Sequence, residues 1–166
     1  MKTKENLKKA FAGESQANRK YLAFAKKAKE DGFEQVSKLF RAAANAETVH
    51  ALSHFDVMGG VKSTKENLKE AIEGETQEFE DMYPEMIETA ENEGNKQAKI
   101  SFKGAMEAEK DHAELYKKAK EAVENGKDLE KKDIFVCQNC GHTVEDKAPE
   151  ECSVCGVKKE YFKKIK

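Results

Sequence analysis

The pattern Glu-x-x-His occurs twice in this chain, in AETVHA at 46–51 and in AEKDHA at 108–113. Residues three apart on a helix share a face, so each copy directs one carboxylate and one imidazole to a common point. Two further helical segments each add a single glutamate. One Glu from each of two helices, plus one Glu-x-x-His from each of the other two, is the arrangement that binds a pair of metal ions in helical bundles. The candidate ligands are Glu14, Glu47, His50, Glu75, Glu109 and His112.

The inward faces of these segments lack a cationic side chain that could balance the carboxylates. The chain has 30 Lys and Arg residues, yet the ionisable residues on those faces are all Glu, His or Tyr. Burying unpaired carboxylates would cost on the order of several kcal/mol for each ion, so a bound cation is expected. Oxygen-rich ligation with one imidazole per metal suits iron or manganese, and zinc or cobalt would also bind.

An internal duplication and helical periodicity predict the elements that position these ligands. TKENLKKAFAGESQ at 3–16 returns as TKENLKEAIEGETQ at 64–77, with ten of fourteen positions identical. Breaker residues near 28–33, 58–63 and 91–95 leave four amphipathic segments with a period of 3.6 residues. The sequence therefore predicts an all-α, antiparallel four-helix bundle in which each half is a helical hairpin.

The second half of the duplication carries an extra carboxylate. The offset between the repeats changes from 61 to 62 residues, and Glu78 has no acidic counterpart in the first half, which makes it a seventh potential ligand. Tyr21 and Tyr83 lie within two turns of a ligand Glu and are predicted to donate hydrogen bonds to the ligand carboxylates. Four other residues receive ordinary structural interpretations, namely His54 and His142 as packing or solvated residues and Met82 and Met86 as core residues.

The four cysteines occupy the last 30 residues as two Cys-x-x-Cys-Gly pairs. Four thiolates so placed form one tetrahedral metal site, whose ligands would be Cys137, Cys140, Cys152 and Cys155. Zinc ribbons use the same spacing, so the spacing alone favours zinc and iron equally; iron would make the tail a one-electron carrier. The predicted domains are a helical bundle at 1–127, a polar linker at 128–133 and a cysteine domain at 134–166.

Composition excludes several classes of partner. The net charge is −2 with a pI near 6.2, and the acidic and basic residues are interspersed, so a nucleic-acid-binding face is not expected. No apolar leader or long apolar run occurs, so we expect no membrane segment. For the same reason we expect a cytoplasmic protein, and in that reducing compartment paired cysteines hold metal more often than they form disulfides.

With these motifs in place, the whole chain resembles rubrerythrin, a ferritin-like di-iron bundle followed by a rubredoxin-like domain. The resemblance implies that Glu47 and Glu109 bridge two irons and that Glu14 is a terminal ligand of the first iron. It also implies that Glu75 and His112 hold the second iron and that the first iron moves between His50 and Glu78. The four cysteines match the rubredoxin iron ligands, although Gln138 and Ser153 stand where rubredoxin-like sequences often place proline.

The same resemblance implies a peroxidase that takes part in oxidative-stress protection. Electrons from NAD(P)H would pass through a partner reductase or rubredoxin to the cysteine-bound iron, then to the di-iron site, where hydrogen peroxide is reduced to water. Two alternatives stay open from the residues. One is a ferritin-like ferroxidase or iron store, and the other is a zinc-filled, redox-silent protein.

Helix lengths also bear on the assembly. A ferritin-like bundle sets its second and third helices parallel, so Glu47 and Glu75 at one height would place the two helix ends roughly 33 Å apart. Residues 59–63 span only about 20 Å when extended. The sequence therefore predicts a homodimer in which helical hairpins are swapped between chains, or else a second helix that unwinds after Ala51.

Overall fold

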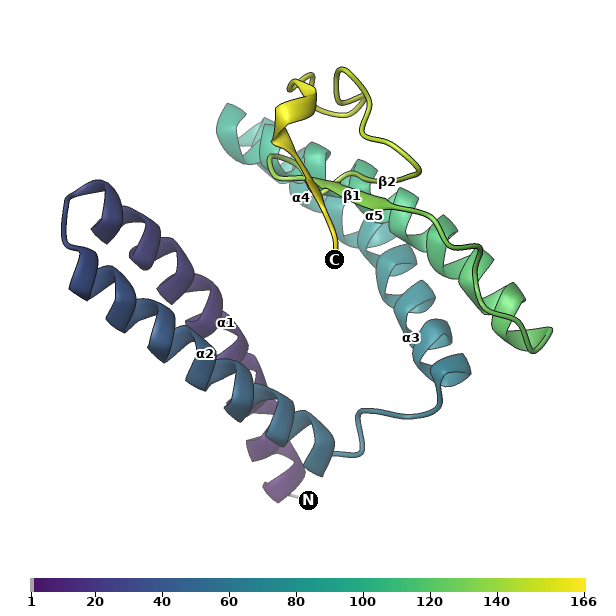
Figure 1. Ribbon diagram of the computed structural model, residues 1–166, viewed down its shortest axis with the longest axis horizontal. Helices are drawn as coiled ribbons and strands as arrows, with labels where there is room; N and C mark the ends of the chain where they lie inside the picture. Colours follow the sequence, from purple (N-terminus) through teal and green to yellow (C-terminus); the bar gives the residue numbers. More distant parts are fainter. Residues whose placement is uncertain (1) are drawn as a thin grey trace. The chain divides into compact units, whose positions relative to one another are not determined.

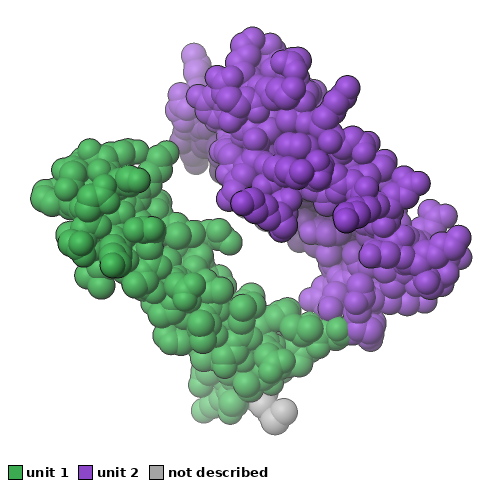
Figure 2. Space-filling model, in the orientation of Figure 1, with its two compact units in different colours: residues 1–62 green, residues 63–166 purple. Residues whose placement is uncertain are grey.

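The computed structural model describes residues 2–166 and consists of two compact units, residues 1–62 and 63–166 (Figure 2). The first unit holds two long helices, and the second holds the remaining helices together with a small sheet (Figure 1). Within the described residues the three predicted helix joints fall where the breaker residues stand, at 31–33, 58–63 and 93–95. The predicted fold class, a ferritin-like helical protein with a small C-terminal cysteine domain, is confirmed.

The first unit is a helical hairpin of α1 (Lys2–Glu30) and α2 (Glu34–Val57). Its most buried residues are small, with Ala25, Ala44 and Ser37 buried between the helices. Small side chains let the two backbones approach closely, and the Ser37 hydroxyl donates to the Ala25 carbonyl at 2.7 Å. Aromatic rings also meet between the two helices, with Phe11 and Phe55 stacked at 5.1 Å between centroids.

The segment between the units begins with a tight helix end. The amide of Met58 donates to the His54 carbonyl, and that of Gly60 donates to the Phe55 carbonyl at 3.0 Å. Gly59 has φ +67°, a conformation that suits glycine at a helix C-terminus. The alternative that α2 unwinds after Ala51 is therefore wrong, because the helix continues to Val57 and is closed by this turn.

In the second unit, α3 (Thr64–Gln77), a π-helical turn η1 (Glu78–Met82) and α4 (Tyr83–Asn92) follow one another without a break and pack against α5 (Lys96–Glu124). Ser63 caps α3, accepting the amide of Glu66 while its own amide donates to the Glu66 carboxylate. Asn95 caps α5 by accepting the amide of Ala98 at 3.1 Å. These caps fix where both ligand-bearing helices begin.

The π turn explains the change of offset between the two repeats. A π turn accommodates one additional residue in a helix, and η1 lies between Gln77, the last residue of the offset of 61, and Tyr83, where the offset is 62. Residues on either side therefore keep the faces that they have in the first repeat. The sequence predicted an unbroken α-helix here, and the structure instead places Glu78 at the start of the inserted turn.

The cysteine domain forms a three-stranded antiparallel sheet in the order β2-β1-β3, from β1 (Ile134–Cys137), β2 (Thr143–Glu145) and β3 (Phe162–Lys164). A short 3-10 turn, η2 (Lys159–Tyr161), precedes β3. The domain lies against α5 of its own unit (Figure 1), and β2 is the strand in contact with that helix. This packing brings the first cysteine knuckle to α5.

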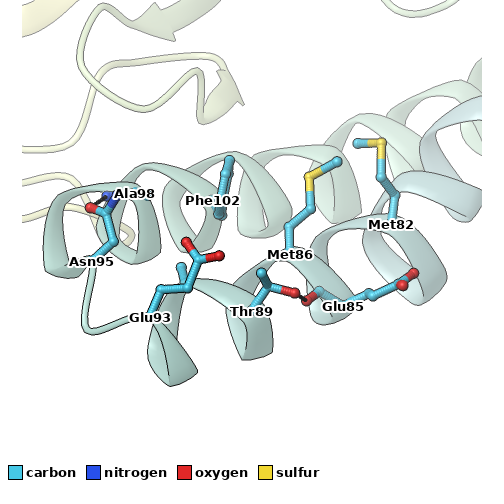
Figure 3. Close-up of a pocket in the computed structure, with 9 residues that line it drawn as sticks. Met82, Glu85, Met86, Thr89, Glu93, Asn95, Ala98 and Phe102 are labelled. Carbon is cyan, nitrogen blue, oxygen red and sulfur yellow. Dashed lines mark hydrogen bonds between the residues drawn. The ribbon is translucent and has the colours of Figure 1, made fainter.

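An apolar groove opens between α4 and α5. Met82, Met86 and Phe102 line it, together with the end of α4, and its volume is about 540 Å³ (Figure 3). Both methionines were predicted as core residues, yet Met86 keeps 38% of its surface exposed in this chain. None of the helices in residues 2–166 has an apolar stretch of the length needed to cross a bilayer.

Deleting Glu78 tests the origin of the π turn. Removing one residue should convert η1 to regular α-helix while Glu75 and Tyr83 keep their faces, so the midpoint of thermal unfolding of the metal-free protein should rise by about 2–4 °C. Far-ultraviolet circular dichroism measures this, with Glu78→Gln as the control that removes the charge but keeps the length. A deletion variant that unfolds at a lower temperature than Glu78→Gln would contradict the interpretation of the π turn as a one-residue insertion.

Candidate metal centres

The first unit brings together three of the predicted ligands, Glu14 from α1 and Glu47 and His50 from α2. Their donor atoms all lie within 4.8 Å of one another, and His50 Nδ1 is 3.0 Å from a Glu47 oxygen. A hydrogen bond with Glu47 raises the pKa of Glu14, while the same bond, followed by the one to His50, lowers the pKa of Glu47. The opposite shifts follow from the close approach of the two carboxyl groups, because two adjacent carboxylates resist ionising together.

The second unit gathers the equivalent three residues, Glu75 from α3 and Glu109 and His112 from α5. His112 Nδ1 lies 2.7 Å from a Glu109 oxygen and 3.7 Å from a Glu75 oxygen. Burial, a hydrogen bond with Glu109 and the charge of Glu109 raise the pKa of Glu75 to about 7. This half of the ligand set is less exposed than the first, since 26% of the His112 side chain is accessible against 55% for His50.

The cysteine domain fixes the tautomer of His112. The Thr143 hydroxyl donates its proton to the Gly141 carbonyl at 3.0 Å, so the hydroxyl oxygen, 2.9 Å from His112 Nε2, accepts the imidazole N–H. The proton on Nε2 leaves the Nδ1 lone pair aimed at the two carboxylates. In this tautomer Nδ1 is free to bind a metal ion that the two carboxylates also hold.

Other groups surround the second half-site. Burial raises the pKa of Glu78, and the nearby charge of Glu109 raises it further, which shows that the side chain after α3 lies beside the ligand set. Burial and then the surrounding carboxylates also raise the pKa of Tyr83 and of Tyr116. Tyr116 was not predicted as a site residue, although its position one turn after His112 on the same face was a usable signal. Tyr21 of the first unit lies among aromatic rings, with Phe40 at 6.2 Å between centroids.

The four cysteines form one cluster in the second unit. Cys137 and Cys155 sulfurs lie 3.7 Å apart, as do those of Cys140 and Cys152. A tetrahedral site with metal–sulfur bonds of about 2.3 Å requires sulfurs about 3.8 Å apart, so the cluster has the size of a metal-bound one. Burial opposes the Cys155 thiolate, but the Val157 amide, the Asn139 side chain and neighbouring thiols lower its pKa to about 7.

The structure corrects the interpretation of His142 as a solvated loop residue. Only 12% of its side chain is exposed, and its Nδ1 lies 2.5 Å from an Asp111 oxygen on α5. The ring also meets the Ser153 hydroxyl at 3.3 Å from Nε2 and faces the ring of Phe162 edge-on. Sequence reasoning missed Asp111 and Thr143 because neither repeats between the halves nor matches a ligand pattern.

Comparisons with known proteins decide the family. The rubrerythrin profile matches residues 5–120, and the profile of the rubredoxin-like domain of rubrerythrins matches residues 135–163. The chain belongs to the rubrerythrin family. Among its relatives, rubrerythrin-2 of Clostridium acetobutylicum is 35% identical over 96% of this chain and 95% of its own length. Rubrerythrin of Porphyromonas gingivalis is 36% identical over 99% of this chain and 90% of its own length.

Solved structures agree with this family. Nigerythrin in a partially reduced state superposes with a TM-score of 0.59 at 34% identity, over 98% of this chain and 86% of that one. A second nigerythrin structure, described as fully reduced and all ferrous, gives a TM-score of 0.58. As a rubrerythrin-family oxidoreductase, this chain has carboxylate and histidine groups that fit two iron ions and a cysteine cluster that fits one. The expected cofactors, two iron ions in the helical part and one in the tail, are confirmed.

The pKa of Glu75 gives the metal-free protein a defined pH dependence. Because the pKa in the folded state, about 7, lies above the ordinary 4.5, the protonated group stabilises the fold fully below about pH 4.5, and this contribution is lost as the pH rises through 7. The melting temperature of Glu75→Gln minus that of the wild type should therefore increase by about 2–4 °C as the pH is raised from 5 to 8. Thermal melts in chelator measure this, with the exposed Glu73→Gln as the matched control. A melting-temperature difference between Glu75→Gln and the wild type that stays constant with pH would contradict the raised pKa of Glu75.

Proposed function

We propose that this chain is a peroxidase that reduces hydrogen peroxide to water in the cytoplasm and protects the cell from oxidative stress. Electrons would come from NAD(P)H through a partner reductase or rubredoxin, enter at the cysteine-bound iron and pass to the two irons of the helical site. The observation that supports this best is the position of His112, whose ring contacts the carboxylate cluster on one side and the cysteine domain on the other.

The reaction balances with the groups at hand. Reducing one hydrogen peroxide to two waters consumes two electrons and two protons, and two ferrous ions, when bound, supply the two electrons. Tyr83 and Tyr116 lie beside Glu75 and Glu109, and their raised pKa keeps both hydroxyls protonated and able to donate. The cysteine site then supplies electrons one at a time to restore the reduced state.

The two halves of the ligand set differ in a way that supports the proposed ligand exchange. His112 is held by Thr143 and is mostly covered, whereas His50 is more than half exposed. Glu78 stands only on the side of the second half-site, beside Glu109. These contrasts support the roles that the family resemblance implies, in which His112 would be a fixed ligand and His50 and Glu78 would exchange on one iron. Glu47 and Glu109 would bridge the irons, and Glu14 and Glu75 would be terminal ligands.

A single-turnover experiment tests the function and its alternatives. One equivalent of peroxide added anaerobically to the fully reduced, iron-loaded protein should restore the absorption of the oxidised cysteine site. Cys155→Ser should still consume one equivalent of peroxide. Its steady-state rate of peroxide reduction with a reductase should fall at least about 100-fold, because electrons can no longer reach the helical irons through the cysteine site. An iron store would instead accumulate many irons per chain with oxygen, and a zinc-filled protein would leave peroxide untouched.

We also propose that the complete di-iron site forms between two chains with swapped hairpins. Glu47 lies ten residues before the end of α2 and Glu75 eleven after the start of α3. In a ferritin-like bundle those helix ends are about 32 Å apart. Residues 58–63 would span about 25 Å even if fully extended, and the turn at 58–60 shortens them further. The uncovered groove with Met82, Met86 and Phe102 supports a first hairpin of the partner chain as its occupant.

Complementation between two inactive variants tests the swap. One chain carries Glu14→Ala and Glu47→Ala, and the other carries Glu75→Ala and Glu109→Ala. A swapped heterodimer contains one intact site, so refolding an equal mixture should restore about a quarter of the wild-type peroxide reduction per chain, although each variant alone is inactive. Chains that complete their own sites would show no recovery. Mixing two copies of the same variant is the control.

A further inference from the structure

The cysteine domain meets α5 through a strip of residues on one face of that helix. At its N-terminal end, an added Cβ on Gly104 would lie 3.4 Å from the Cys140 Cβ, and one on Gly141 would lie 3.6 Å from the Ala108 side chain. Ala108 keeps only 1% of its surface exposed. Glycine on one side and small residues on the other therefore let the first cysteine knuckle sit directly on the helix.

Polar contacts follow further along the same strip. Asp111 and His112 are adjacent on α5, and they contact His142 and Thr143, which are adjacent in the tail. Lys118 donates to Glu145 at 2.5 Å as a third and more exposed contact. Because the first two contacts join neighbouring residues on both sides, a displacement that breaks one must also strain the other.

Within this strip, His142 connects α5 to the metal ligands of the tail. Its Nδ1–H donates to Asp111, its Nε2 accepts from the Ser153 hydroxyl of the second knuckle, and its backbone amide donates to the Cys140 sulfur. Its carbonyl accepts the Cys137 amide at 2.9 Å. A single residue thus ties the helix that carries His112 to both knuckles of the cysteine site.

We infer that Asp111 and His142 are positioning residues that lock the cysteine domain onto α5 so that Thr143 can hold His112, and that this docked arrangement is the one in which electrons reach the helical irons. The inference rests on the proposed peroxidase function. Neither residue touches the reacting atoms. Their effect is exerted through the placement of Thr143, 2.9 Å from the imidazole of a metal ligand.

The first test measures docking without any redox step. Replacing the Asp111 carboxylate by an amide weakens its charge-assisted hydrogen bond to His142 and raises the ratio of undocked to docked molecules by about tenfold, and proteolysis of the linker follows the undocked population. In the zinc-loaded protein, which is expected to be mostly docked, Asp111→Asn should therefore speed tryptic cleavage at Lys127 and Lys131 about tenfold. Asp111→Glu should restore most of the protection. Glu114→Gln is the matched control, since it removes one negative charge from an exposed pair within α5.

The second test measures electron passage in the iron-loaded, fully reduced protein. After one equivalent of peroxide, Asp111→Asn should oxidise its helical irons at the wild-type rate, while oxidation of its cysteine-bound iron slows by the factor by which the docked fraction falls, as given by the linker cleavage rate relative to that of the undocked domain. Its metal content and cysteine-site absorption should be unchanged, which separates positioning from loss of the site.

Two results would overturn the inference. Either Asp111→Asn matches Glu114→Gln in linker cleavage, or the oxidation rate of the cysteine-bound iron fails to follow the docked fraction that linker cleavage gives. If the wild-type iron protein fails to reduce peroxide, the proposed function fails, and the zinc-loaded cleavage experiment still decides whether Asp111 holds the domain.

Discussion

The structure depends on carboxylates that are gathered on helix faces where the chain provides no cation. Each unit brings two glutamates and a histidine within 4.8 Å, and the pKa of Glu75 rises to about 7 as burial and the neighbouring carboxylate oppose its charge. An arrangement of this kind is unfavourable until divalent ions neutralise it. Metal binding is therefore expected to stabilise the folded protein as well as to serve its chemistry.

Small residues serve a second purpose in the other unit. Gly104, Ala108 and Gly141 remove side-chain volume where the cysteine domain meets α5, which brings a thiolate ligand and a carboxylate-bound histidine to the same stretch of helix. The hydroxyl of Thr143 then selects the tautomer of His112 that can bind metal through Nδ1. The cysteine domain is thus held against α5 by close packing and hydrogen bonds as well as by the linker.

The asymmetry between the two halves arises from one inserted residue. The repeats keep a constant offset of 61 residues over their first fourteen positions. The π turn at Glu78–Met82 then adds a carboxylate to the second half without rotating the residues that follow. The docked cysteine domain adds a second difference, since His50 is exposed whereas His112 is held by Thr143. A difference of this kind is what the proposed change of ligand requires.

The sequence by itself determined the helix boundaries, the internal duplication, the two ligand triplets and the cysteine cluster. These follow from local rules, because helical spacing places Glu47 with His50 and Glu109 with His112 whatever the rest of the chain does. The π turn was visible only as a changed offset, since an inserted residue can be absorbed by a turn or by a loop. The partners of His142 and Thr143 were not predictable from the sequence. They depend on where a separate small domain docks, and such contacts between distant segments are set by surface shape and hydrogen-bond geometry, which no local pattern encodes.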